Sequence, residues 1–407
     1  MNLQLYRNDA PVEGVINITG SKSESNRLLI LQALYPEIEI KNLSNSDDSQ
    51  VLQKALASVE KTVDIHHAGT AMRFLTAYFA AGNREVILTG SERMQQRPIE
   101  ILVNALRDLG ADIEYVHNEG FPPLRIKGKK LLRNKVSLQA NVSSQYISAL
   151  MLIAPSLPNG LEINLEGKTT SVPYIKMTLS LLKNAGFSGT FDGNNIKIDP
   201  KEKIAPVTLT VESDWSSASY FYSIAALSEK AEIVLSSYKR SSNQGDAVVE
   251  EIYRKLGVMT AYAGEKVTLL KNGNTEPEKI SLDLADSPDL AQTVTTTCFG
   301  LGVECELTGL HTLKIKETDR LEALKTEIEK MGGKVDITND SLKLYATDNF
   351  KSNVKIATYN DHRMAMAFAP LAMKVPVEIK DAGVVSKSFP GFWEDLEKLG
   401  FSCKKEV

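Results

Sequence analysis

The chain has 407 residues, a net charge of −4 and 24% charged residues. This length suffices for two domains, and the composition is ordinary for a globular protein. A weakly acidic chain has no overall positive field with which to attract nucleic acid or an anionic membrane, so we expect neither as a partner.

The first predicted helix begins within Thr19–Arg27. A glycine and several serines that can cap a helix precede leucines at helical spacing, and the pattern ends at Tyr35. A helix start has unpaired backbone N–H groups and a partial positive charge. Ser23 and Arg27 are four residues apart and share one face, with Lys22 beside them. The stretch is therefore either a solvated helix start or a site for an anion.

This pattern of a polar turn before an apolar helix returns five times. The later starts lie near residues 69, 143, 216, 289 and 361, spaced by about 72–74 residues. A second helix follows each first one, and five of these are predicted to end at glycines, namely Gly110, Gly186, Gly257, Gly332 and Gly400. Short strands such as Glu85–Thr89 lie between helices. Each repeat is predicted to be helix, strand, helix, strand, strand.

Six repeats, three in each half, predict an α/β protein of two pseudo-threefold domains with helices packed inside sheets. We place the first domain at residues 20–212 and the second at residues 1–19 with 213–407. The chain would then cross twice between the domains, which makes a natural hinge. The space between two domains is a common place for a ligand, so we expect the active site there.

The predicted helix starts are rich in cations and hydroxyl groups. They carry Lys22, Ser23, Arg27, Arg73, Arg97, Ser143, Ser144, Gln145, Lys316, Glu317, Arg320, Arg363 and Lys387. If they face one cleft, the cleft suits a ligand with several phosphates or carboxylates. Glu317 and Arg320 share a helix face, and an acid among cations can donate or accept a proton. The alternative for these two residues is an exposed salt bridge at a helix start.

Other patterns exclude several kinds of site. The three cysteines form no CxxC pair, so we expect no disulfide framework and no metal site. No GxGxxG motif follows a predicted strand, and we expect no cofactor. Gly167-Lys168-Thr169 lacks the earlier glycine of a phosphate-binding loop. The first residues are too polar for a signal peptide, and no apolar run approaches the ~20 residues that span a bilayer. We expect a reduced, cytoplasmic protein.

Several blocks together resemble the 5-enolpyruvylshikimate-3-phosphate synthase family over essentially the whole chain. The matching blocks are Gly20–Ser23 with Asn26-Arg27, Ala68–Arg73, Arg93-Met94 with Arg97–Ile99, Val142–Gln145, Asp214 with Ser216–Ala218, Lys316–Arg320, Tyr359–Met366, and Lys387 with Phe389-Pro390. The resemblance implies the enolpyruvyl transferase fold, an inside-out α/β barrel in each domain. It also implies a monomer and a reaction of the shikimate pathway, which leads to chorismate and the aromatic amino acids.

The implied reaction transfers the enolpyruvyl group of phosphoenolpyruvate to the 5-hydroxyl of shikimate 3-phosphate. By resemblance, Asp289 takes the hydroxyl proton, Glu317 protonates the methylene carbon, and Lys22 lies close to the reacting atoms. The residues implied for shikimate 3-phosphate are Lys22, Ser23, Arg27, Ser143, Ser144, Gln145, Ser171, Tyr174, Asp289 and Lys316. Those implied for phosphoenolpyruvate are Lys22, Gly69, Arg97, Gln145, Arg320, Arg363 and Lys387.

Three positions depart from the family pattern, namely His67, Phe74 and Thr312. With Gly69 retained, we expect the inhibitor glyphosate to enter, although Phe74 can reshape that wall. The alternatives are the sister transferase that acts on UDP-N-acetylglucosamine, a relative of RNA-terminal phosphate cyclase, and a binding protein without activity. The sister enzymes usually have Lys-Asn where this chain has Lys22-Ser23, and commonly a cysteine before the Arg-Pro pair.

Overall fold

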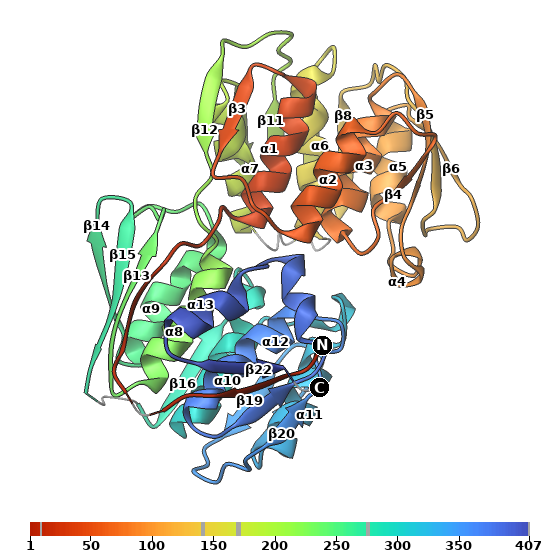
Figure 1. The fold of residues 1–407 in the computed structure, drawn as a ribbon. Helices are drawn as coiled ribbons and strands as arrows, with labels where there is room; N and C mark the ends of the chain where they lie inside the picture. Colours follow the sequence, from red (N-terminus) through yellow and green to blue (C-terminus); the bar gives the residue numbers. More distant parts are fainter. Residues whose placement is uncertain (9, 140–142, 168–171, 274–276, 406–407) are drawn as a thin grey trace. The chain divides into compact units, whose positions relative to one another are not determined.

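The computed structural model describes residues 1–8, 10–139, 143–167, 172–273 and 277–405. The chain divides into two compact units. Gly20–Val211 form one, called here the N-terminal unit, and Met1–Thr19 with Glu212–Val407 form the other, the C-terminal unit. Helices and sheets alternate in both (Figure 1), which confirms the predicted α/β class.

The N-terminal unit contains helices α1 (Lys22–Leu34), α2 (Asp47–Ala57), α3 (Gly69–Ala80), α4 (Glu92–Gln95), α5 (Glu100–Asp108), α6 (Ser144–Ile153), η1 (Ala154–Ser156) and α7 (Val172–Asn184). Its strands are β3 (Ile38–Lys41), β4 (Thr62–Asp64), β5 (Glu85–Thr89), β6 (Asp112–Tyr115), β7 (Leu124–Lys127), β8 (Lys135–Gln139), β9 (Leu161–Glu166), β10 (Gly189–Asp192), β11 (Asn195–Ile198) and β12 (Val207–Thr210).

The C-terminal unit contains helices α8 (Trp215–Leu227), η2 (Gly245–Val248), α9 (Val249–Lys255), η3 (Pro288–Leu290), α10 (Ala291–Leu301), η4 (Leu313–Ile315), α11 (Arg320–Lys330), α12 (His362–Phe368), η5 (Ala369–Met373), η6 (Ala382–Lys387) and α13 (Phe392–Lys398). Its strands are β1 (Leu3–Tyr6), β2 (Val12–Ile16), β13 (Lys230–Ser236), β14 (Met259–Ala263), β15 (Lys266–Asn272), β16 (Lys279–Asp283), β17 (Glu304–Thr308), β18 (Lys334–Ile337), β19 (Leu342–Tyr345), β20 (Val354–Ile356), β21 (Val377–Ile379) and β22 (Ser402–Lys405).

The four-stranded sheets share one topology. In the sheet β4-β5-β7-β6, β4 and β5 are parallel and lie on either side of α3 in the chain, while β6 and β7 form an antiparallel hairpin after α5. The other four-stranded sheets repeat this order, namely β8-β9-β11-β10, β2-β13-β15-β14, β16-β17-β19-β18 and β20-β21-β1-β22. The repeat is therefore strand, helix, strand, helix, strand, strand.

The predicted repeat was wrong in one respect, because it omitted the opening strand. Two of these strands, Thr62–Asp64 and Val354–Ile356, have three residues each and are too short for an alternating pattern to stand out. The first repeat differs again: between Ala57 and Thr62, where every residue is described, the chain forms no hairpin. That repeat keeps only the parallel pair β3 and β12.

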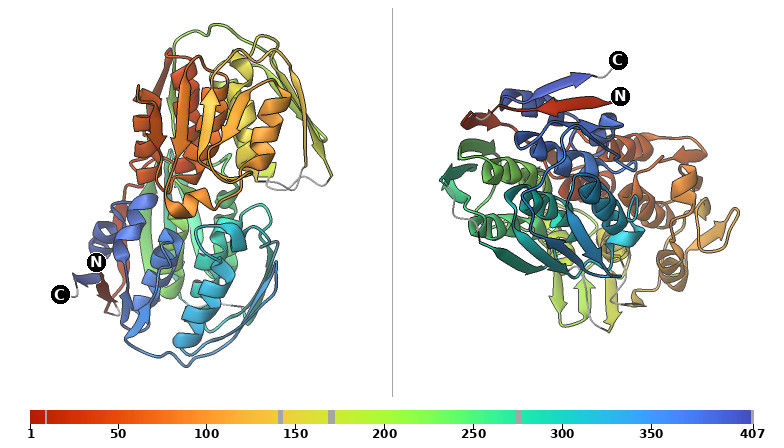
Figure 2. Two further views of the ribbon diagram at one scale, coloured as in Figure 1. Left: turned by 90° about the vertical axis from the view of Figure 1, so that its right-hand side faces the viewer. Right: turned by 90° about the horizontal axis from the view of Figure 1, so that it is seen from below.

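The N-terminal residues complete sheets of the C-terminal unit. Strand β1 pairs antiparallel with both β21 and β22, and β2 pairs parallel with β13. Figure 2 shows β1 and β22 side by side at the two ends of the chain. The fourth and the sixth repeats thus take a strand each from the beginning of the sequence.

The first helix of each repeat lies inside its unit. All seven residues of α12 are buried, and Ser216 is the one residue of α8 that is not. A helix that is buried on every side must be enclosed by other elements. In the C-terminal unit α10 packs against both α8 and α12, and in the N-terminal unit α6 packs against α1 and α3. This confirms the prediction of helices inside sheets.

The predicted ends of the second helices are also confirmed. The backbone has a positive φ at each glycine that was expected to end one, namely Gly110, Gly186, Gly257, Gly332 and Gly400. Side chains cap several helix starts, among them Ser46, Asp214, Asp319 and Asp361. None of the helices in the described ranges is long and apolar enough to cross a membrane.

Candidate active site

Arg27 joins three helices of the N-terminal unit. It lies on α1 and is 2% exposed. Its Nε donates to Thr178 Oγ1 of α7 at 2.8 Å, and its Nη2 donates to Ser148 Oγ of α6 at 2.9 Å. Its Nη1 donates to the backbone oxygen of Ser23 at 2.7 Å, which confirms that these two residues share a helix face. We call Ser23, Arg27, Ser148 and Thr178 the hydroxyl cluster.

Glu24, on the same helix, is the carboxylate whose charge attracts Arg27. None of the described residues forms an ion pair with Arg27, and its neighbours include the rings of Phe74 and Tyr174, with centroids 5.4 and 5.9 Å from Cζ. Burial lowers the pKa of Arg27 to about 10, so that it stays charged at neutral pH. Its hydrogen bonds use three of five N–H groups, and two remain for a ligand. Such a site favours an anion.

A second guanidinium lies against the start of α3. A Cβ atom at Gly69 would be 2.6 Å from Arg97 Nη1 and 3.3 Å from Arg73 Nη1, so this close approach requires glycine. Arg97 is half-buried, and its guanidinium forms no hydrogen bond or ion pair with any residue in the described part of the chain. The first backbone N–H groups of α3 likewise have no hydrogen-bond acceptor within the helix. The pair of Gly69 and Arg97 can therefore bind an anion.

The remaining predicted residues of this unit lie at neighbouring helix starts. Gln145 donates from Nε2 to Thr70 Oγ1 at 3.2 Å, and its backbone N–H donates to Ser143 Oγ at 3.4 Å. Ser144 is the first residue of α6 and is 9% exposed. Lys22 pairs with Asp48 of α2, with 3.3 Å between Nζ and Oδ2. Ser171 lies outside the described residues.

In the C-terminal unit, Asp289 is surrounded by cations. Its Oδ1 lies 2.9 Å from Arg320 Nη1 and 3.7 Å from Lys316 Nζ. Its Oδ2 accepts from Arg363 Nη2 at 2.8 Å. The three cations come from α11, the turn before it, and α12. The geometry brings together residues that are up to 74 positions apart in the chain.

Glu317 and Asp361 extend this arrangement. Glu317 pairs with Arg320 Nη2 through Oε2 and with Lys387 Nζ through Oε1, at 3.0 Å each. Asp361 accepts from Arg320 Nε at 2.7 Å. Arg320 is 2% exposed, and its guanidinium is bound by three carboxylates. We call the whole set the ion-pair cluster, which comprises Asp289, Lys316, Glu317, Arg320, Asp361, Arg363 and Lys387.

The cations keep Asp289 ionised. Burial alone would raise the pKa of this carboxyl, but Arg363, Lys316 and Arg320 together hold it well below its usual range. The pKa of Lys316 is lowered: the attraction of Asp289 raises it, and burial with the charge of Arg320 outweighs that attraction. Burial opposes the charge of Arg320, yet its carboxylate partners raise its pKa. In this cluster the attraction between opposite charges therefore offsets the unfavourable effect of burial on each charged group.

The turn before α12 positions Asp361. Tyr359 and Asn360 have φ values of 53° and 55°, a left-handed conformation that costs free energy for residues other than glycine. Tyr359 is held by its hydroxyl, which donates to Glu327 Oε1 at 2.5 Å. Asp361 can then accept from the backbone N–H of Arg363 at 2.9 Å and from the Arg320 guanidinium. One carboxylate thus caps a helix and orients an arginine.

The structure brings Ser23 and Arg27 into the hydroxyl cluster, and it brings Asp289, Lys316, Glu317, Arg320, Arg363 and Lys387 into the ion-pair cluster. The predicted residues outside both clusters include Lys22, Gly69, Arg97, Ser143, Ser144 and Gln145. The structure excludes one alternative for Glu317 and Arg320, the exposed salt bridge at a helix start, because the pair is buried with other charges. Sequence reasoning missed four side chains that hold these groups, namely Ser148, Thr178, Asp361 and Asp48. Two had a usable signal, since Asp48 and Asp361 stand at predicted helix starts. His67, one of the departures, is exposed and bonded to Ser91 Oγ at 2.7 Å.

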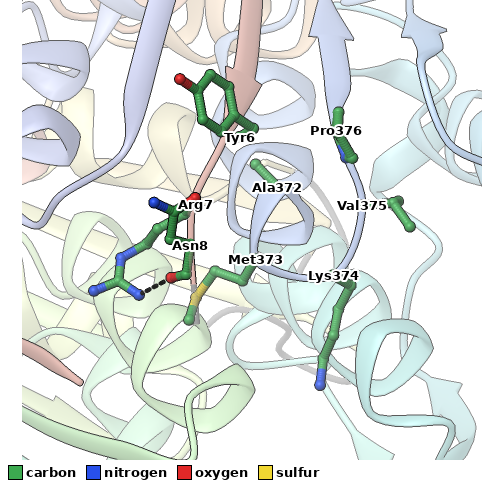
Figure 3. A pocket seen from close by; sticks show the side chains of 8 residues that line it. All are labelled: Tyr6, Arg7, Asn8, Ala372, Met373, Lys374, Val375 and Pro376. Carbon is green, nitrogen blue, oxygen red and sulfur yellow. Dashed lines mark hydrogen bonds between the residues drawn. The ribbon is translucent and has the colours of Figure 1, made fainter. Parts of the chain in front are cut away.

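A separate depression lies at the end of β1 in the C-terminal unit (Figure 3). It is lined by Tyr6, Arg7, Asn8, Ala372, Met373, Lys374, Val375 and Pro376. The Arg7 guanidinium donates to backbone oxygens of Leu399, Asn8, Ala10 and Pro11, at 2.7–3.0 Å. Its charge therefore supports the local backbone, and we assign no ligand to this depression.

Comparisons with known proteins agree with one another. The family described as EPSP synthase (3-phosphoshikimate 1-carboxyvinyltransferase) matches residues 50–396. A 3-phosphoshikimate 1-carboxyvinyltransferase of Bacteroides fragilis is 51% identical, with 97% of each chain covered. One from Haemophilus influenzae is 35% identical, with 95% of this chain and 96% of that one covered. The solved structure of EPSP synthase from Acinetobacter baumannii has a TM-score of 0.80 at 22% identity and covers 99% of this chain and 100% of that chain.

Proposed function

Since the chain belongs to the EPSP synthase family, we propose that it transfers the enolpyruvyl group of phosphoenolpyruvate to the 5-hydroxyl of shikimate 3-phosphate, with release of phosphate. Both substrates are small polyanions. The observation that carries the proposal is the ion-pair cluster, in which two carboxylates, Asp289 and Glu317, share the same arginine. Such a set can bind an anion and move protons beside it.

In the first half of the proposed reaction, Glu317 gives a proton to the methylene carbon of phosphoenolpyruvate. The neighbouring carbon becomes electrophilic and is attacked by the 5-hydroxyl, whose proton goes to Asp289. In the second half, the new methyl group returns a proton to Glu317, the C–O bond to phosphate breaks, and the proton on Asp289 leaves with the phosphate. Fixed cations stabilise the negative charge of the tetrahedral intermediate without having to reorient.

Substrate binding would prepare both acids for these steps. In the structure, Glu317 is paired with Arg320 and Lys387, and such pairing favours the ionised carboxylate. We infer that the phosphate or carboxylate of phosphoenolpyruvate takes over part of these contacts. A carboxylate that loses a cationic partner holds a proton more tightly. The bound substrate would thereby raise the proton affinity of the acid that must protonate it.

We assign the individual residues as follows. Phosphoenolpyruvate would be bound by Lys22, Gly69, Arg97, Gln145, Arg320, Arg363 and Lys387. Shikimate 3-phosphate would be bound by Lys22, Ser23, Arg27, Ser143, Ser144, Gln145, Ser171, Tyr174, Asp289 and Lys316. The two free N–H groups of Arg27 support a bidentate contact with the substrate carboxylate. The unpaired guanidinium of Arg97 beside Gly69 supports the phosphoenolpyruvate assignment.

The proposal includes the wider expectations from the sequence. Both clusters would serve one reaction, with closure of the two units excluding water from it. The protein would act in the cytoplasm as a monomer. Glyphosate would compete with phosphoenolpyruvate, since Gly69 is retained and Phe74 is buried beside Arg27. Kinetics with both compounds test this point, and no competition at millimolar glyphosate would contradict it.

The decisive experiment measures phosphate release from phosphoenolpyruvate, with shikimate 3-phosphate or UDP-N-acetylglucosamine supplied in separate reactions. We expect release with shikimate 3-phosphate alone. Release with the sugar nucleotide alone would assign the chain to the sister reaction. Release with neither, from protein shown by circular dichroism to be folded, would leave a binding role without catalysis.

A further inference from the structure

A buried carboxylate that the proposed reaction does not use lies next to the ion-pair cluster. Asp246 of η2 is 5% exposed, and its Oδ2 is hydrogen-bonded to Ser216 Oγ of α8. The same Ser216 oxygen accepts from Arg363 Nη2 at 3.3 Å, so the single hydroxyl proton of Ser216 is donated to Asp246. Arg363 Nη2 also donates to Asp289 Oδ2 at 2.8 Å. A continuous chain of contacts therefore joins Asp246 to Asp289.

The second carboxylate oxygen of Asp246 has a different environment. Its Oδ1 is buried and accepts no hydrogen bond from the described residues. An ionised carboxylate with a buried, unbonded oxygen is unfavourable, whereas a proton on that oxygen removes the charge. Burial first, and the charge of Asp289 second, raise the pKa of Asp246 to about 7, against the opposing effects of Arg363 and Ser216. Asp246 thus changes charge near neutral pH.

Among the charged side chains around η2, one cation is linked to Asp246 by hydrogen bonds. The elements that pack against Asp246 or interact with it electrostatically carry Asp214 at the start of α8, Glu250, Glu251, Arg254 and Lys255 in α9, Asp289 in η3 and Arg363 in α12. Arg254 and Lys255 lie in the last turn of α9, and Glu250 accepts from the Tyr262 hydroxyl at 2.6 Å. Arg363 is the cation linked to Asp246, through Ser216.

We propose that Asp246 is a positioning residue that controls, through Ser216, how strongly Arg363 binds an anionic substrate. The inference rests on the proposed function, in which Arg363 binds phosphoenolpyruvate. An ionised Asp246 adds a second carboxylate that competes with the substrate for Arg363. A protonated Asp246 leaves Arg363 to Asp289 and the substrate. Anion binding at this arginine is therefore stronger below neutral pH than above it.

The test compares the KM for phosphoenolpyruvate of the wild type and Asp246→Asn from pH 6 to pH 8.5. Asparagine keeps the acceptor for Ser216 and stays neutral, and the titration of the substrate cancels in the ratio of the two KM values. We expect the ratio of wild type to variant to rise by about tenfold across this range, with a smaller change in kcat. A ratio that stays constant with pH would overturn the proposal.

Two further variants separate this effect from a structural one. Ser216→Ala removes the hydroxyl that links Asp246 to Arg363, so we expect the pH-dependent rise in KM to become smaller, and Ser216→Thr should restore it. Asp395→Asn is the control, since Asp395 is also buried with a raised pKa and pairs with Lys398 instead. The same pH-dependent ratio in this control would contradict a specific role for Asp246.

Thermal unfolding without substrate supplies a readout that does not depend on catalysis. Folded Asp246 holds a proton more tightly than the unfolded chain does, so wild-type stability should fall relative to Asp246→Asn as the pH rises from about 4 to about 7. Melting differences that do not change with pH would overturn the proposal. Absence of any phosphate release would contradict the proposed function itself, a result distinct from release with a constant KM ratio.

Discussion

The hydroxyl cluster and the ion-pair cluster hold their arginines in opposite ways. Arg27 is bound by hydroxyl and carbonyl oxygens, which are neutral, and forms no ion pair with any carboxylate in the described part of the chain. Arg320, equally buried, is bound by three carboxylates. An anion that binds Arg27 of the hydroxyl cluster supplies a negatively charged partner for the guanidinium. An anion that binds Arg320 of the ion-pair cluster must displace one of its carboxylates. The displaced carboxylate then has a different proton affinity. One cluster suits binding, and the other suits binding combined with proton transfer.

The largest effect should come from the acid of the ion-pair cluster. Glu317→Gln keeps the shape and one acceptor oxygen but cannot donate the proton. We expect kcat for phosphate release to fall by about a thousandfold, with little change in KM for either substrate. Glu322→Gln, an exposed carboxylate in the first turn of α11, is the matched control and should be close to wild type. Near wild-type turnover in Glu317→Gln would remove this residue from the mechanism.

The next effect tests whether the carboxylates also hold the fold. Asp361 is fully buried against Arg320, so Asp361→Ala leaves a buried charge with one partner fewer. We expect the free energy of unfolding to fall by about 3 kcal/mol, measured by urea titration. Asp319→Ala is the comparison, because Asp319 caps α11, forms no ion pair with the described residues, and its loss should cost about 1 kcal/mol. Equal losses in the two variants would mean that Asp361 acts only as a cap.

A smaller effect is expected in the hydroxyl cluster. Arg27→Ala removes a cation that is ion-paired with none of the described residues, so binding of shikimate 3-phosphate should weaken. We expect its KM to rise by about a hundredfold while the KM for phosphoenolpyruvate changes little. Arg27→Lys is the control, because it keeps the charge but loses the bidentate geometry of the guanidinium. Its KM for shikimate 3-phosphate should lie between those of the wild type and Arg27→Ala. An unchanged KM for shikimate 3-phosphate in Arg27→Ala would show that the free N–H groups do not contact it.

The difference between the clusters explains what the sequence could predict. Helix starts and ends depend on neighbouring residues, so the pattern at Gly69 or Gly332 suffices to locate them. The same holds for Glu317 and Arg320, which are three residues apart. The carboxylates around Arg320 come from three separate segments, and only the folded chain brings Asp289 and Asp361 to it.

Neutral partners were harder still to predict. Ser148 and Thr178 lie inside apolar helices, where a hydroxyl is usually satisfied by its own backbone. Both accept from Arg27 of another helix, and Thr178 does so while its own hydroxyl donates to the backbone oxygen of Tyr174. Two of the opening strands, β4 and β20, were missed for a related reason, because a strand of three residues is recognised by its partner and not by its own pattern. Long-range contacts account for what the sequence did not show.

The smallest effect that still separates the two substrates should come from Gly69→Ala. The added Cβ would lie 2.6 Å from Arg97 Nη1, and because that atom ends a flexible side chain, the guanidinium can shift while α3 stays in place. We expect the KM for phosphoenolpyruvate to rise by about tenfold, with stability and the KM for shikimate 3-phosphate nearly unchanged. Gly383→Ala, at a glycine with open space around it, is the control. If the KM for shikimate 3-phosphate rose instead, Arg97 would belong with Arg27, and the assignment of these two unpaired arginines to different substrates would be wrong.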